Sequence, residues 1–252
     1  MNSLRKLARL CGHMVRISFT NPRRISHVLG VALAASDEVA DTSVDLLRFP
    51  QVTLEDLLPA AGSDTRAILG LLPNTNGSIS VMEFVGLILL LKKANAKSVF
   101  EFGTYKGVSI TQLALNMPEN SRIYTLDLPE DDPRSSMPIT DPEDIALARE
   151  KGKGALVPRD VAPRIQFLKQ DSATFDETPF AGQMDLIFVD GAHNADYVRN
   201  DSEKAWRMAR SGGIVAWHDC RVADPAVVRF LLGCPFRPSR IAGTSLAFAV
   251  KP

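Results

Sequence analysis

The stretch Val99-Phe100-Glu101-Phe102-Gly103-Thr104-Tyr105-Lys106-Gly107-Val108-Ser109 decides the fold. The run from Ser98 to Phe102 is short and mostly apolar, which predicts a buried strand. A glycine-containing turn follows, and the apolar pattern from Val108 to Met117 then predicts a helix. A buried strand that leads through a glycine turn into a helix is typical of the units that build parallel sheets.

The alternation of strands and helices continues to the end of the chain. Further strands are predicted over Arg122 to Asp127, Arg164 to Lys169, Met184 to Asp190, Ile214 to His218 and Thr244 to Val250. Helices are predicted over Asn194 to Arg210, ending at Ser211-Gly212-Gly213, and near Pro225 to Leu232. Ser80 and Glu83 form a capping-box pattern that begins another helix, ahead of Phe84 to Leu91. We therefore predict an α/β, Rossmann-like sheet with helices on both faces.

Composition narrows the class of protein. The chain has 252 residues, of which 45% are hydrophobic, and 29 basic residues balance 29 acidic ones. Zero net charge argues against nucleic-acid binding through global charge. The three cysteines have no framework spacing and fit a reducing compartment, and the longest apolar run, Val85 to Leu91, is too short to span a membrane. A soluble cytoplasmic protein is the expectation.

The first 78 residues differ from the rest, and we predict a helical N-terminal extension over 1–78 ahead of a main domain over 79–252. Six arginines and lysines precede the first acid, Asp37, and the first helix has an apolar face opposite its basic one. Such a helix would make weak contact with an anionic membrane surface or an acidic partner. The favoured alternative is packing on its own domain or on a second subunit, which would give a homo-oligomer.

Carboxylates lie at or close to the carboxyl ends of the predicted strands, where ligands bind in parallel sheets. Glu101, Asp127, Asp171, Asp190 and Asp219 occupy these places. Glycines 103 and 107 would let the backbone turn and approach a ligand closely, but their spacing lacks the third glycine of a dinucleotide site. A carboxylate at position 101 would repel phosphate and attract a cation. S-adenosylmethionine, a nucleoside with a sulfonium and an ammonium group, fits this pattern.

The run from Glu101 to Ser109 resembles motif I of class I S-adenosylmethionine-dependent methyltransferases, in the form found in catechol O-methyltransferase and its relatives. The runs Asp185 to His193, Gly212 to Asp219 and Gly243 to Ala249 are similar to the methyltransferase domain 24 family, which includes antibiotic sugar O-methyltransferases. The resemblance covers about residues 80 to 252. It implies a mostly parallel sheet of seven strands, the last of them antiparallel.

The resemblance also implies the site residues. Those that would bind the cofactor are Glu101, Gly103, Thr104, Tyr105, Gly107, Ser109, Asp127, Leu128, Asp171, Ser172 and Asp190. Asp190 and Asp219 match two ligands of the Mg²⁺ ion of metal-dependent relatives. The third ligand falls on Cys220, which Mg²⁺ disfavours, and His218 in its place would suit Mn²⁺ better. His193 lies where the catechol enzymes carry the lysine that removes the proton, so it would be the base, beside Asp190.

A long insertion, at about residues 129–163, separates Asp127 from Gln166. Its first part is acidic and its second part carries Arg149, Lys151 and Lys153. Loops of this length are usually lids or binding elements, although an idle surface loop is an equal alternative. A charged lid with few aromatic residues favours a polar acceptor, such as a hydroxyl of a sugar or natural product.

The predicted function is transfer of a methyl group from S-adenosylmethionine to a hydroxyl of a small molecule or glycoside, with assistance from Mg²⁺ or Mn²⁺. The first alternative is a nicotinamide-dependent oxidoreductase on a related sheet. The second is a non-catalytic, cofactor-binding subunit that recruits a partner. The third is hydroxylation on the same scaffold, which iron dependence would reveal.

Overall fold

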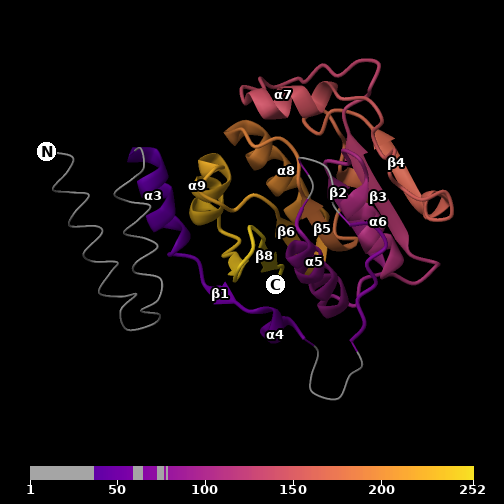
Figure 1. The fold of residues 1–252 in the computed structure, drawn as a ribbon, viewed down its shortest axis with the longest axis horizontal. Coiled ribbons are helices and arrows are strands. Elements are labelled where there is room, and N and C mark those ends of the chain that lie inside the picture. Colours follow the sequence, from indigo (N-terminus) through magenta and orange to yellow (C-terminus); the bar gives the residue numbers. More distant parts are fainter. Residues whose placement is uncertain (1–36, 59–64, 73–76, 78) are drawn as a thin grey trace, which may run out of the picture.

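A sheet of eight strands forms the centre of the computed structural model, which describes residues 37–58, 65–72, 77 and 79–252 (Figure 1). The strand order is β1-β7-β8-β6-β5-β2-β3-β4. The strands are β1 (Gln51–Val52), β2 (Ser98–Phe102), β3 (Arg122–Asp127), β4 (Ile165–Lys169), β5 (Met184–Val189), β6 (Ala209–Trp217), β7 (Ser239–Ile241) and β8 (Ala247–Val250). All neighbours are parallel except β8, which runs antiparallel to both β6 and β7.

The mostly parallel α/β sheet and its antiparallel last strand are confirmed, but the expected number of seven strands is wrong. The additional pairing comes from β1, two residues of the N-terminal extension that pair in parallel with β7. The backbone N–H groups of Arg240 and Ala242 donate to the carbonyls of Pro50 and Val52. So short a strand forms because the edge of the sheet supplies partners for its backbone.

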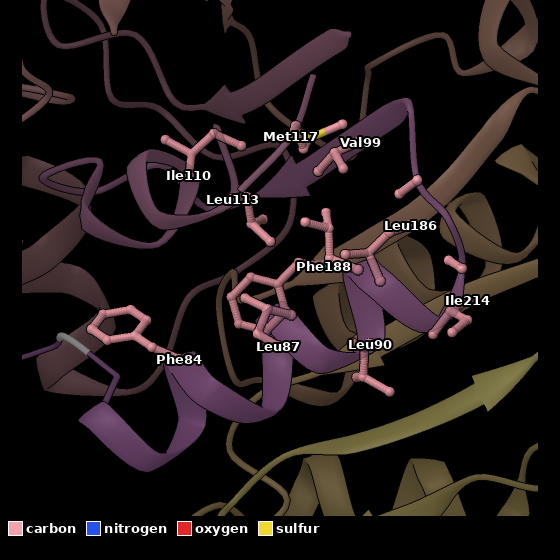
Figure 2. Packing of buried hydrophobic residues seen from close by; sticks show 14 of the residues in the cluster. Phe84, Leu87, Leu90, Val99, Ile110, Leu113, Met117, Leu186, Phe188 and Ile214 are labelled. Carbon is pink, nitrogen blue, oxygen red and sulfur yellow. The ribbon is translucent and has the colours of Figure 1, made fainter. Parts of the chain in front are cut away.

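Alternate residues of each strand point to opposite faces, so the sheet has two cores. On one face, α5 (Val81–Lys93) and α6 (Val108–Leu115) pack on the strands. Figure 2 shows Leu87 of α5 beside Phe188 of β5, and Phe84 and Leu90 of α5 belong to the same buried cluster. On the other face lie α8 (Ala195–Met208) and α9 (Pro225–Gly233), with α3 (Asp37–Leu46) against α9. The carboxyl ends of the strands are left free for a site.

The capping box of α5 is confirmed. The Ser80 hydroxyl accepts the Glu83 N–H, and the Glu83 carboxylate accepts the Ser80 N–H at 2.7 Å. The predicted end of α8 is wrong, because the helix stops at Met208 and β6 already begins at Ala209. The Ser211-Gly212-Gly213 stretch is therefore an irregularity within β6, between the pairing of Ala209 with Met184 and that of Ile214 with Leu186.

The extension contributes α3, β1 and the short helix α4 (Leu54–Leu57) within its described part. The basic amphipathic first helix falls within residues 1–36, outside the described residues. The insertion carries α7 (Pro142–Arg149), at the top of Figure 1. Within the described ranges, no helix combines the length and the apolar character that crossing a membrane requires.

Candidate active site

A cavity of about 280 Å³ opens at the carboxyl ends of the strands. Its lining includes most of the predicted site residues, namely Gly103, Thr104, Tyr105, Ser109, Asp127, Leu128, Asp171, Ser172, Asp190, His193, His218 and Asp219. Glu101 and Gly107 are not among the lining residues. The structure thus brings the glycine turn, the acids of the strand ends and both histidines to one cavity.

Glu101 lies behind the cavity wall. Its side chain is fully buried and accepts hydrogen bonds from the Ser109 hydroxyl at 2.5 Å and the Thr125 hydroxyl at 2.6 Å. Burial raises the pKa of Glu101 to about 8, although both hydrogen bonds oppose the shift. Ser109 therefore stands between this carboxyl group and the cavity.

The two glycines of the turn approach other parts of the protein rather than open space. Gly103 has φ +92°, and a Cβ there would lie 2.0 Å from the carbonyl oxygen of Asp190. Gly107 has φ +80°, and a Cβ there would lie 2.4 Å from the side chain of Val157 in the insertion. Each position needs glycine for its positive φ and for a close protein contact.

Asp127 organises the turn. One carboxylate oxygen accepts the N–H groups of Thr104 and Tyr105, at 3.1 and 2.8 Å. The other accepts the Leu128 N–H at 2.8 Å and lies 3.0 Å from Nζ of Lys153, which comes from the insertion. These four donors occupy the acceptor capacity of the carboxylate.

Asp171 shapes the loop after β4. It accepts hydrogen bonds from the backbone N–H groups of Ala173 and Ser136, and from the Tyr197 hydroxyl at 2.9 Å. The pKa of Asp171 is lowered, because these bonds outweigh its burial. Ser136 belongs to the insertion, so this acid ties the insertion to the end of the cavity predicted to hold adenine.

Three side chains at the ends of β5 and β6 fit a divalent metal ion. The candidate ligand atoms of Asp190, His218 and Asp219 lie within 4.8 Å of one another. His218 Nδ1 is 3.0 Å from the Asp190 carboxylate and 2.8 Å from that of Asp219. Among the described residues, His218 Nε2 and Asp219 Oδ1 are buried without a hydrogen bond, although Arg221 makes an ion pair with Oδ1 at 3.0 Å. Two carboxylates and an imidazole suit Mn²⁺, Fe²⁺ or Zn²⁺ better than Mg²⁺.

The surroundings of this cluster are strongly polarised. The pKa of His218 is raised well above its usual value, because Asp190, Asp219 and Glu83 overcome its burial. Glu83 Oε2, from the start of α5, lies 3.5 Å from His218 Nε2. Cys220 is fully buried in the core, and burial raises the pKa of its thiol to about 12, so it does not complete the ligand set.

His193 lies between two carboxylates. Its Nε2 is 2.6 Å from Asp219, and its Nδ1 is 2.6 Å from Asp144 of α7, which also accepts the His193 backbone N–H at 2.8 Å. Although burial opposes it, these two acids raise the pKa of His193 to about 11. His193 can accept a proton from another group only when Asp219 is engaged elsewhere and the ring has lost one of its own.

The sequence does not identify three residues of the site, which are Glu83, Asp144 and Lys153. Asp144 and Lys153 were only part of the charged insertion, and Glu83 was only a helix cap. Glu83 meets Ser245 and His218, which are more than 130 positions away in the chain, and no local pattern signals such contacts. The acidic and basic halves of the insertion were the available signal for Asp144 and Lys153.

Comparisons with known proteins agree with this geometry. Residues 100–220 match the model of a family described as methyltransferase domain. A caffeoyl-CoA O-methyltransferase 3 from Nicotiana tabacum is 26% identical over 55% of this chain and 54% of its own length. A caffeoyl-CoA O-methyltransferase 2 from Eucalyptus globulus is 25% identical over 79% of this chain and 72% of its own. The chain spans about half the length of most of the first curated relatives it matches.

A solved structure shares this fold. A Staphylococcus aureus protein assigned as a caffeoyl-CoA O-methyltransferase has a TM-score of 0.50 and 14% identity, covering 69% of this chain and 85% of that one. The family match and these relatives together confirm the resemblance seen in the motifs. Residues 100–220 match the methyltransferase domain family, and the chain is similar to class I S-adenosylmethionine-dependent O-methyltransferases.

Proposed function

We propose that this protein transfers the methyl group of S-adenosylmethionine to a hydroxyl group of a small molecule. The observation that carries the proposal is the continuity of one cavity from the glycine turn at the end of β2 to Asp190, His193, His218 and Asp219 at the ends of β5 and β6. A cofactor at the first end would present its methyl group to an acceptor at the second. Alignment of the two reactants supplies much of the catalysis of such a transfer.

Different residues of the cavity would bind the cofactor, hold a metal ion and remove the proton. Gly103, Thr104, Tyr105 and Ser109 would hold the methionine part of the cofactor, with Asp127 near the ribose. Asp190, His218 and Asp219 would hold a divalent metal ion, Mn²⁺ in preference to Mg²⁺. There the ion would supply Lewis acidity that lowers the pKa of the acceptor hydroxyl. His193 would remove the hydroxyl proton.

The charges of the cavity favour an uncharged, polar acceptor such as a hydroxyl of a sugar or natural product. The lysines and arginine among the lining residues all have carboxylate partners: Lys106 pairs with Glu150, Lys153 with Asp127, and Arg221 with Asp224. The phosphates of an acyl-CoA, the acceptor type named for the plant relatives, would need cations that are free to bind them.

The test is thermal stability with S-adenosylhomocysteine or NAD(H), each with and without Mn²⁺ or Mg²⁺. A ligand at 100 times its dissociation constant adds about 2.7 kcal/mol, which corresponds to roughly 5–10 °C for a domain of this size. A shift with S-adenosylhomocysteine supports the proposal. A shift with NAD(H) alone would instead favour an oxidoreductase.

Turnover comes next. Labelled S-adenosylmethionine would be offered with methyl glycosides, catechol and caffeoyl-CoA, and methylated products would be detected by mass spectrometry. His193→Ala should lower turnover by ~10²-fold or more if His193 is the base. A loss below tenfold with cofactor binding intact excludes that role. Binding of the cofactor without turnover on any acceptor would favour a non-catalytic subunit.

A further inference from the structure

Asp144 is a buried acid that the proposed chemistry does not yet use. It lies on α7 of the insertion, 49 positions before His193, and its side chain is only 4% exposed. Both of its oxygens contact the same residue, because Oδ2 accepts the His193 backbone N–H while Oδ1 meets ring Nδ1. A carboxylate buried in this way is stable only if its oxygens are hydrogen-bonded.

We infer that Asp144 is a positioning residue that fixes the orientation of the His193 ring and so makes the insertion a working part of the active site. This inference rests on the proposed function insofar as it gives His193 a catalytic role.

The two contacts determine the orientation of the ring. The bond to the backbone N–H holds the carboxylate in place, and the contact at Nδ1 then sets the rotation of the imidazole. Nδ1 becomes a hydrogen-bond donor, and Nε2 is the nitrogen that faces Asp219 and the cavity. In acid–histidine pairs of this kind, the carboxylate keeps the other nitrogen directed at the reacting group.

A purely structural role for Asp144 does not account for this arrangement, because the insertion is already fastened at other points. The Ser136 N–H donates to Asp171, the Asn194 side chain donates to the Pro138 carbonyl, and Lys153 pairs with Asp127. These contacts already hold the insertion in place, so the Asp144 carboxylate is not needed at the His193 ring for that purpose. The insertion is then more than an idle surface loop.

The first test observes the ring directly in the ligand-free protein, by NMR of ¹⁵N-labelled histidines. The chain has four histidines, and the His193 signal is assigned by its loss in His193→Asn. We expect Asp144→Asn to abolish the low-field Nδ1–H signal of His193. Asp131→Asn, which changes an exposed acid of the same insertion, should leave it in place. A His193 signal that is unchanged in Asp144→Asn overturns the inference.

The second test is kinetic and uses the acceptor found in the turnover screen. Asp144→Asn should lower kcat by about 10- to 100-fold, with the Kd for S-adenosylhomocysteine within about twofold of wild type. In a His193→Asn background the same change should cost less than about twofold, because its effect acts through the ring. An equal loss in both backgrounds shows a structural role and overturns the inference.

Two further outcomes are separable. If wild type shows no turnover at all, the proposed function fails, while the NMR test still decides the role of Asp144. If Asp144→Asn does not fold, His193→Asn takes its place, because it keeps the backbone bond to Asp144 and should lose kcat with the insertion still docked. Normal turnover in that variant overturns the inference.

Discussion

Glu101→Gln tests whether the acid at the end of β2 is neutral in the folded protein. Burial raises the pKa of Glu101 from 4.5 to about 8, so about nine-tenths of the molecules carry it protonated at pH 7. Between these two pKa values the folded state binds more protons than the unfolded state. The stability of the wild-type protein should therefore fall as pH rises from about 5 to 8.

The size of this change in the free energy of unfolding follows from the shift in the pKa of Glu101. One pKa unit corresponds to 1.36 kcal/mol, so ionisation of the unfolded chain costs the folded state about 3 kcal/mol at pH 7. Glutamine has the same shape and carries no charge, and the hydroxyls of Ser109 and Thr125 can rotate to serve its amide. The variant should lack this contribution, so its stability should fall less than that of the wild type between pH 5 and pH 8. The raised pKa of His193 adds a loss above about pH 6.5 that both proteins share.

Urea unfolding at pH 5, 6, 7 and 8 measures the effect. The control is Glu119→Gln, which removes an exposed carboxylate and should follow the wild-type curve. A wild-type stability that stays level over this range, or a variant that falls in parallel with it, would refute the argument from burial.

Binding gives a second readout, since a neutral Glu101 predicts that Glu101→Gln changes the Kd of either S-adenosylmethionine or S-adenosylhomocysteine by less than about threefold. A loss of tenfold or more for the sulfonium compound alone would show that Glu101 acts as a charge.

Other expected outcomes concern the backbone, the helix cap and the metal. Gly103→Ala should cost at least ~3 kcal/mol in urea unfolding, because its Cβ would collide with the Asp190 carbonyl. Gly233→Ala, which meets nothing within 4 Å, should change stability by less than ~1 kcal/mol. Glu83→Ala should cost ~2–3 kcal/mol, because α5 loses its capping box and Ser245 loses two hydrogen bonds. Asp219→Asn should abolish the Mn²⁺-dependent gain in Tm measured with S-adenosylhomocysteine, as a chelator should in wild type; a gain that persists places the ion elsewhere.

Elements defined by local signals could be predicted from the sequence. The bounds of β2 and β3 agree with the prediction, because each strand is a short apolar run limited by a turn. The start of α5 was also predictable, since its capping box lies within four residues. In each case the residues that signal the element lie within the element or next to it in the chain.

Elements that depend on distant partners could not be predicted. β1 is too short to give a periodic signal and forms only beside β7, almost 190 positions later. The glycines before Ile214 have the composition of a helix stop, but the pairing of Ala209 with Met184 draws them into the sheet. Local propensity was overruled there by a contact between strands.

The site likewise has features that the local sequence predicts and features that depend on distant contacts. Its acids were predictable because the carboxyl ends of parallel strands meet at one edge, wherever the helices lie. The sequence did not distinguish Glu101, which lies behind the cavity wall, from Asp190, which lines it, because both lie near the carboxyl end of a buried strand. That difference depends on Ser109 of α6, which covers Glu101.

Two residues of the cavity have a strained backbone, although Asn95 and Arg237, with φ values of 47° and 54°, are equally strained outside it. Tyr105 and Asp219 have φ values of 43° and 54°, in the left-handed region that residues with side chains rarely adopt. Each such residue costs of order 1 kcal/mol or more and persists only where its surroundings fix it. Asp127 holds the N–H of Tyr105, while both histidines of the cavity hold the carboxylate of Asp219. What separates Tyr105 and Asp219 from Asn95 and Arg237 is therefore not the strain but these hydrogen bonds, which fix both residues in the wall of the cavity.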